Sequence, residues 1–137
     1  MDADASVLEH LSRDECVRLM GSVPVGRIVY TRQALPAVEL VNFALDGGDI
    51  VIRTNLSGKL AAAMHGTVVA FEADDLDPID KAGWSVTAIG RSRWVSDPAD
   101  TEHLRRINQD TWAPGEREHF IRISPEILNG RMLRSMS

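Results

Sequence analysis

A polar turn near the middle of the chain carries residue types that bind phosphate. Arg53 and Thr54 end an apolar run, and Ser57, Gly58 and Lys59 follow directly ahead of a short helical pattern. At such a strand-to-helix corner, free backbone N–H groups and the positive end of the helix dipole favour an anion. The cations add charge, the hydroxyls donate hydrogen bonds and the glycine allows close approach of the backbone. The turn therefore predicts a phosphate site.

A purely structural interpretation of this turn stays open beside the phosphate one. Ser57 could be only an N-cap, Lys59 a solvated helix residue and Arg53 a charge at a strand edge. A nucleotide-triphosphate loop of the form G-x-x-x-x-G-K-[ST] does not fit, because its first glycine would fall at Arg53 and Leu60 replaces the hydroxyl that binds Mg²⁺. ATP and GTP are therefore poor candidates for the ligand.

The segments around the turn predict strands with helices at three connections. β-branched and alternating apolar residues predict about six strands, over residues 25–31, 37–45, 50–54, 67–74, 84–96 and 120–123, with 127–133 extending the last or packing beside it. Helical patterns cover residues 12–20, 57–64 and 99–111. Because no regular βαβ alternation occurs, the pattern predicts a mainly β fold, a small and largely antiparallel barrel with helical connections.

Local signals define several ends and bends of these elements. Residues 12–15 have the S-x-x-E form of a capping box, and Gly47 with Gly48 predicts a hairpin between two strands. Gly90 predicts a bulge or bend where the sheet curls. The acidic run over residues 74–78 is expected to break regular structure, so the strand before it should end there.

Size, charge and cysteine content limit the class of protein. With 137 residues, of which 44% are hydrophobic, the chain fits one domain over residues 1–137, with a core over about 11–133. A net charge of -5 argues against nucleic-acid or anionic-membrane partners. The one cysteine, Cys16, lies on the apolar side of a predicted helix, and no basic leader or long apolar run is visible. A cytoplasmic, soluble protein is expected, with Cys16 a buried thiol.

Other groups with possible chemistry are better explained by structure. The four histidines lack metal-ligand spacing, although His65 could face a substrate. An acidic segment resembles part of a calcium loop but lacks the required glycine and terminal glutamate, so a solvated turn is favoured; its members are Asp74, Asp75, Asp77 and Asp80. Core or interface packing is favoured for Trp94 and Trp112.

Several motifs, in order, resemble those of the pyridoxamine 5′-phosphate oxidase-like flavoproteins, the flavin split-barrel family. The segment Thr54-Asn55-Leu56-Ser57-Gly58-Lys59 resembles the T-N-x-x-S-x-K phosphate loop of that family. The accompanying motifs are Pro24-Val25-Gly26-Arg27, Leu40-Val41-Asn42-Phe43, Phe71-Glu72 and Trp84-Ser85-Val86 with Gly90 further on. The similarity runs from about Leu11 to Leu133.

The resemblance implies a six-stranded split barrel that binds FMN at the interface of a homodimer. By position, Arg53, Thr54, Ser57 and Lys59 would hold the FMN phosphate, with Gly58 standing where many relatives carry a second basic residue. Leu40, Val41 and Asn42 would run beside the isoalloxazine and ribityl chain. Ser85, with Trp84 beside it, occupies the place of a polar flavin contact that the partner subunit can supply in such dimers.

The implied function is an FMN-dependent oxidoreductase acting on a small organic acceptor, nitroaromatics being one candidate. The C-terminal segment lacks the R-L-x-P ending by which pyridoxamine phosphate oxidases recognise their substrate, so that particular activity is not expected. A deazaflavin-dependent reductase stays open as an alternative. A barrel that binds flavin or haem without catalysis also stays open, because no proton donor is evident near the proposed site.

Overall fold

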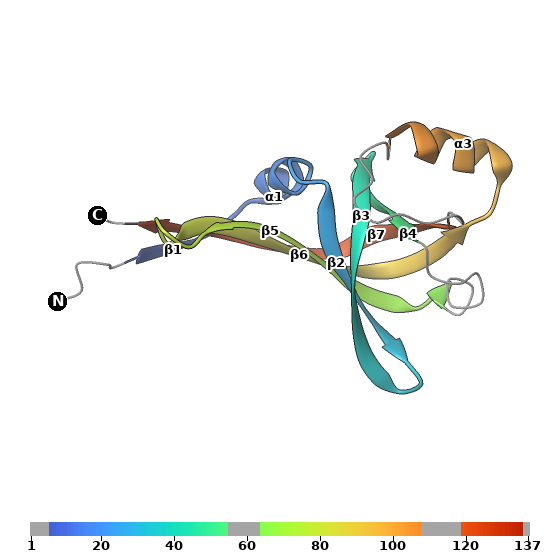
Figure 1. Ribbon diagram of the computed structural model, residues 1–137, viewed down its shortest axis with the longest axis horizontal. Coiled ribbons are helices and arrows are strands. Elements are labelled where there is room, and N and C mark those ends of the chain that lie inside the picture. Colours follow the sequence, from blue (N-terminus) through green and yellow to red (C-terminus); the bar gives the residue numbers. More distant parts are fainter. Residues whose placement is uncertain (1–5, 55–63, 108–118, 136–137) are drawn as a thin grey trace.

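Seven antiparallel strands and two helices make up the described part of the chain. A computed structural model of the protein describes residues 6–54, 64–107 and 119–135 (Figure 1). The strands are β1 (Ser6–His10), β2 (Val25–Arg32), β3 (Leu35–Asp46), β4 (Asp49–Thr54), β5 (Val68–Asp77), β6 (Ala82–Val95) and β7 (His119–Ser135). The helices are α1 (Arg13–Met20) and α3 (Pro98–Ile107).

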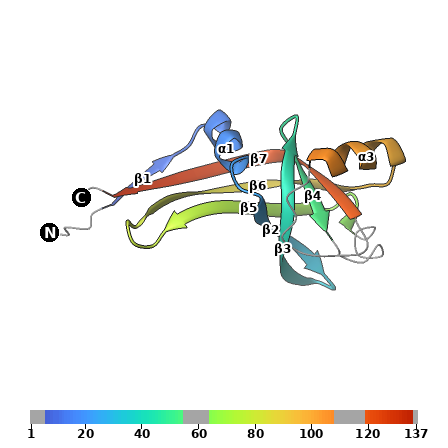
Figure 2. The same ribbon diagram turned by 45° about the horizontal axis from the view of Figure 1, so that its top comes forward.

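Six of these strands close into a ring. The sheet order is β1-β7-β4-β3-β2-β5-β6, and an additional pairing of β6 with β7 closes the ring, with β1 outside it. Figure 2 shows β5, β6 and β7 side by side along the long axis, with β3 and β4 steeply inclined to them. The predicted six-stranded antiparallel barrel is confirmed, and β1 is an unpredicted seventh strand that pairs only with β7.

The bend predicted at Gly90 is confirmed. The register between β6 and β7 shifts between Ile89 and Gly90, as expected of a bulge. A Cβ built on Gly90 would overlap the carbonyl oxygen of Ser124 and lie 2.9 Å from its carbonyl carbon. Glycine is needed here because the two backbones pass too closely for a side chain.

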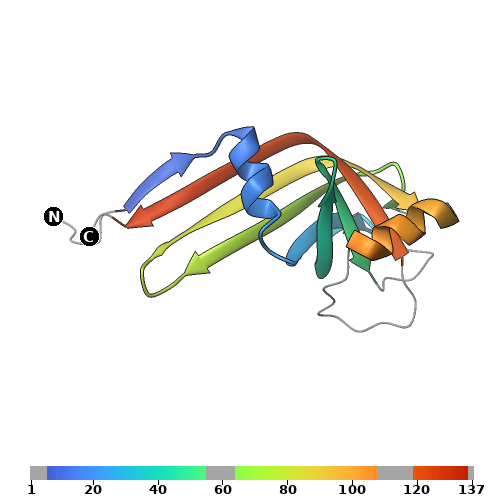
Figure 3. The same ribbon diagram turned by 90° about the horizontal axis from the view of Figure 1, so that it is seen from above.

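The first helix begins at the predicted capping box and buries its apolar side. The Ser12 hydroxyl accepts a hydrogen bond from the Glu15 backbone N–H, and the Ser12 N–H donates to Oε1 of Glu15, each over 3.2 Å. Cys16, Leu19 and Met20 are buried in the main core. The helix packs across β6 and β7, as Figure 3 shows. Burial also raises the pKa of the Cys16 thiol, which fits the inert role predicted for it.

The second described helix covers a separate part of the barrel. Leu104 of α3 is fully buried with Val51 of β4 and Phe120 of β7 in a small second core. The predicted helix over 99–111 is confirmed as far as Ile107. The predicted helix over 57–64, Trp112 and the last residues of the 99–111 prediction fall on residues outside the described ranges, apart from Met64.

The expectation that the acidic run breaks regular structure is wrong. β5 continues to Asp77, because its residues pair with β6 as far as Asp77 opposite Ala82. The turn comes afterwards, where the Asp77 carboxylate accepts hydrogen bonds from the N–H groups of Ile79 and Asp80. Within the described ranges, no group of three or more histidine, cysteine or acidic residues could hold a metal ion.

Among the described residues, no helix is long and apolar enough to cross a membrane.

Candidate functional site

Two of the predicted flavin contacts lie side by side on β3 and β4, near the end of β4. Asn42 is the register partner of Arg53, so the two side chains project from the same face of neighbouring strands. Asn42 is buried, whereas Leu40, two residues earlier on that face, is 61% exposed. Val41, between them, points into the main core. An amide, a guanidinium and an apolar side chain therefore share one surface of the barrel.

The rest of the predicted phosphate turn cannot be placed in this way. Ser57, Gly58 and Lys59 lie outside the described residues, so their roles remain predictions. β4 ends at Thr54, where the strand was expected to end and the turn to begin.

Three motifs that the sequence singled out separately meet on the outer face of the barrel. Leu40 of β3 is the register partner of Arg27 of β2, which is in turn the partner of Glu72 of β5. Nη1 of Arg27 lies 3.0 Å from Oε1 of Glu72 and 3.1 Å from Oδ2 of Asp74. We call these three charged residues the Arg27 cluster.

The Arg27 cluster holds a carboxyl that titrates near neutral pH. Burial raises the pKa of Glu72 to about 7, and the hydrogen bond and repulsion of the Asp74 carboxylate add to the rise. Arg27 acts in the opposite direction and lowers this pKa. Two carboxylates share one guanidinium, so with both ionised the three residues carry a net charge of -1.

The predicted contacts on β6 point to opposite faces. Ser85 is the register partner of Asp74, and its side chain therefore lies on the outer face beside the Arg27 cluster. Trp84 is 7% exposed and belongs to the main core. Of these two residues, only Ser85 faces the surface that also carries Leu40.

An apolar row runs beside the Arg27 cluster across five strands. Its members, each the register partner of the next, are Val38 of β3, Val29 of β2, Ala70 of β5, Ile89 of β6 and Ile127 of β7. Val38 is 62% and Ile127 50% exposed, although both are large hydrophobic residues. Such an exposed apolar stretch is typical of a surface that binds a ligand or partner. We call these five residues the apolar row.

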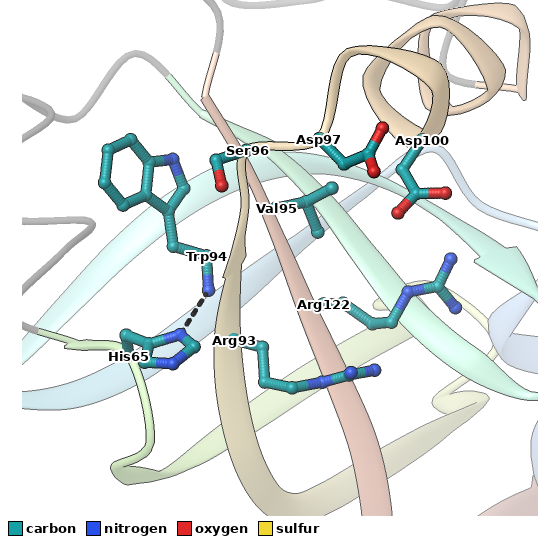
Figure 4. A pocket seen from close by; sticks show the side chains of 8 residues that line it. All are labelled: His65, Arg93, Trp94, Val95, Ser96, Asp97, Asp100 and Arg122. Atoms are coloured by element: carbon teal, nitrogen blue, oxygen red, sulfur yellow. Dashed lines mark hydrogen bonds between the residues drawn. The ribbon is translucent and has the colours of Figure 1, made fainter.

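A separate hollow of about 430 Å³ lies between β6, β7 and the start of α3 (Figure 4). His65, proposed from the sequence as substrate-facing, borders it, and its Nδ1 accepts a hydrogen bond from the Trp94 N–H over 3.1 Å. Arg122 donates from Nη2 to Asp46 over 2.6 Å and from Nη1 to Asp49 over 3.0 Å. These contacts join β7 to the turn of the β3–β4 hairpin, because Asp46 is the last residue of β3 and Asp49 the first of β4. The role of Arg122 is therefore structural.

Replacing Arg122 by methionine is expected to lower the free energy of unfolding by about 1–3 kcal/mol at pH 7, because two carboxylates lose their partner. The hydrogen bond from Arg122 lowers the pKa of Asp46, so the stabilisation is present above the ordinary carboxyl pKa and lost as the pH falls through the lowered one. Denaturant titrations at pH 7 and pH 3 should show the gap between wild type and variant shrinking in acid. Arg93→Met, at the register partner of Arg122 on β6, is the control and should change stability by less than about 0.5 kcal/mol.

The sequence comparison agrees with this fold. The family description "Pyridoxamine 5′-phosphate oxidase" matches residues 12–132, nearly the whole chain. The chain belongs to this family. Its relatives include the Mycobacterium tuberculosis protein Rv0080, which is 42% identical over 125 residues that cover 88% of this chain and 82% of that protein.

Solved structures of proteins with similar sequences share this fold. An FAD-binding protein from Mycobacterium smegmatis is 35% identical, with a TM-score of 0.77 over 92% of this chain and 98% of that one. A conserved protein of unknown function from Corynebacterium diphtheriae is 26% identical, with a TM-score of 0.74 over 90% of this chain and 96% of that one. The family and its structures support a flavin-binding protein.

The Arg27 cluster was not predicted as a unit from the sequence. Glu72 and Asp74 are two residues apart, a spacing that places both on one face of a strand. The pair was not recognised because Asp74 was predicted as the last residue of its strand and the first of an acidic turn, and because Arg27 lies 45 residues before Glu72 in the chain.

Proposed function

We propose that the protein is a homodimeric, FMN-binding oxidoreductase that passes hydride or electrons to a small organic acceptor. The observation that carries the proposal is the pairing of Asn42 with Arg53 at the end of β4, next to exposed Leu40, in a fold shared with flavin-binding proteins. The described side chains fit a flavin, because a cation suits its phosphate, an amide its polar edge and an apolar side chain its ring.

The chain's own residues would bind and orient the cofactor. Arg53 would neutralise phosphate charge together with Lys59, and the hydroxyls of Thr54 and Ser57 would fix the phosphate geometry. Asn42 would hydrogen-bond the polar edge of the ring while Leu40 packs against its apolar part. Once bound, the flavin supplies the electron-transfer chemistry, so the protein needs mainly to position it and exclude water.

The homodimer is part of the same proposal. Ser85 lies on the exposed outer face and could contact a flavin held by a second copy. The exposed members of the apolar row would be covered by such a contact.

FAD is the second candidate cofactor, because the 35%-identical protein from Mycobacterium smegmatis is described as FAD-binding. Both cofactors carry the phosphate that the turn after β4 is predicted to hold. FAD differs from FMN by its adenylate part, and no described residue specifically favours the binding of an adenylate.

The cofactor can be identified by mass spectrometry of the ligand released when freshly purified protein is denatured. FMN is the expected result, and titration of the apo protein with FMN and FAD should rank FMN as the tighter ligand. A released deazaflavin, or an apo protein that binds neither flavin, would contradict the proposal. After anaerobic reduction, an oxidoreductase should also be reoxidised at a rate that depends on acceptor concentration, whereas a storage protein should not.

A further inference from the structure

A row of four register-paired residues crosses the outer face of the barrel where α3 packs. Val95 of β6 is the partner of Phe120 of β7, Phe120 is the partner of Arg53 of β4, and Arg53 is the partner of Asn42 of β3. Register partners project from the same face of neighbouring strands, with their Cβ atoms about 5 Å apart. Arg53, which is proposed to bind the flavin phosphate, therefore lies between a buried aromatic ring and a buried amide.

The buried neighbours of Arg53 limit the directions in which its side chain can extend. Phe120 is 1% and Asn42 4% exposed, and Val51, two residues earlier on the same face of β4, is fully buried. On one face of a sheet, a residue is surrounded by its two register partners and by the residues two positions before and after it. The position after Arg53 in this sense, residue 55, follows the end of β4 and lies outside the described residues. The direction left open therefore leads toward the predicted phosphate turn.

The helix α3 covers two of these neighbours and so completes the second core. Leu104 is fully buried against Val51 and Phe120, and it is the one buried residue of α3 over Pro98–Ile107. In Figure 3, α3 lies across the beginning of β7, where Phe120 is found. The packing beside Arg53 thus depends on a single leucine of a helix that is distant in the chain.

We propose that Leu104 and Phe120 are positioning residues for the flavin phosphate, because the second core holds the Arg53 side chain in the orientation in which it binds. The proposal rests on the proposed function and adds a role for α3 that needs no contact between the helix and the flavin. A free arginine side chain has several rotatable bonds, and fixing it before the ligand arrives lowers the entropy cost of binding. Loss of the second core should therefore weaken binding through the phosphate.

The Leu104→Ala variant of the full-length apo protein tests this role by opening the second core from the helix side. Its affinity for FMN should fall by about 3- to 10-fold, because Arg53 regains rotational freedom. Riboflavin lacks the phosphate, so the affinity for riboflavin should stay within about twofold of the wild-type value. Leu104→Met refills the core with a side chain of similar volume and should restore the FMN affinity. Fluorescence titration with each flavin measures these affinities.

The matched control is Leu19→Ala, the same substitution on the other described helix. Leu19 of α1 is buried in the main core and not in the second core. Circular dichroism should show that the control is folded, and its affinities for FMN and riboflavin should equal those of the wild type. Leu104→Val is a smaller change that should show the same selective loss of FMN affinity, and it replaces Leu104→Ala if that protein does not fold.

The Arg53→Met protein separates positioning from general destabilisation. If Leu104 acts through Arg53, adding Leu104→Ala to Arg53→Met should not weaken FMN binding further, because the side chain to be positioned is already absent. A loss of FMN affinity by the same factor in both backgrounds would show that the second core does not act through Arg53, and would overturn the proposal.

Failure of this inference and failure of the proposed function give different results. A wild-type protein that binds FMN no more tightly than riboflavin would overturn the phosphate site, and the positioning role with it. A wild type and a Leu104→Ala protein that prefer FMN over riboflavin by the same factor would overturn only the positioning role. An equal loss of FMN affinity in Leu19→Ala would also overturn it, since opening either core would then have the same effect.

Discussion

The Gly90→Ala protein is expected to lose about 3 kcal/mol or more of its free energy of unfolding and to be largely unfolded at 37 °C. The added methyl group would overlap the carbonyl oxygen of Ser124 on the neighbouring strand. Neither backbone can move away freely, because β6 is held by β5 on one side and by β7 on the other. The clash therefore opens the β6–β7 pairing, which is the contact that closes the barrel.

Denaturant titration followed by far-ultraviolet circular dichroism measures this effect. Gly21→Ala is the matched control, because Gly21 has a φ of -71° and its added Cβ would lie 3.3 Å from the flexible end of Leu45 and no closer than 3.4 Å to any backbone atom. The control should change stability by less than about 1 kcal/mol. A Gly90→Ala protein as stable as the control would show that the bulge at Ile89 and Gly90 does not need glycine.

The second large effect is expected at the phosphate turn. Lys59→Ala and Arg53→Met should each weaken flavin binding by about 10- to 100-fold, because a hydrogen bond to a charged group contributes roughly 1.5–3 kcal/mol. Both cations are proposed to meet the same phosphate, so their combined loss should exceed either single effect. Fluorescence titration of the apo proteins with FMN measures these affinities.

The lysine in the β5–β6 turn gives the matched comparison. Lys81→Ala makes the same change of charge and size as Lys59→Ala but lies outside the proposed site. Its FMN affinity should stay within about twofold of the wild type. Equal affinities for Lys59→Ala and the wild type would reject the phosphate turn, and would leave the simple N-cap and solvated-lysine interpretation as the better one.

Local patterns in the sequence were enough to predict most individual elements. The capping box at Ser12 and Glu15 starts α1 as expected, because both of its hydrogen bonds form within one turn of chain. The glycines at 47 and 48 adopt positive φ in the hairpin turn, a conformation that glycine adopts at low cost. The strand β1 was missed because its stability comes from pairing with β7, more than 120 residues later in the chain.

By itself, the sequence determined the mainly β class, the six barrel strands along the chain and the bend at Gly90, because these depend on local chemistry; the flavin-family phosphate turn after Thr54 stays a prediction from motif order. Only the tertiary structure decided that Arg27 meets Glu72 and Asp74, that Asn42 faces Arg53, and that Trp84 is buried while Ser85 is turned outward. Those relations depend on strand register and on closure of the ring, which join residues far apart in the chain and leave no local trace in the residues themselves.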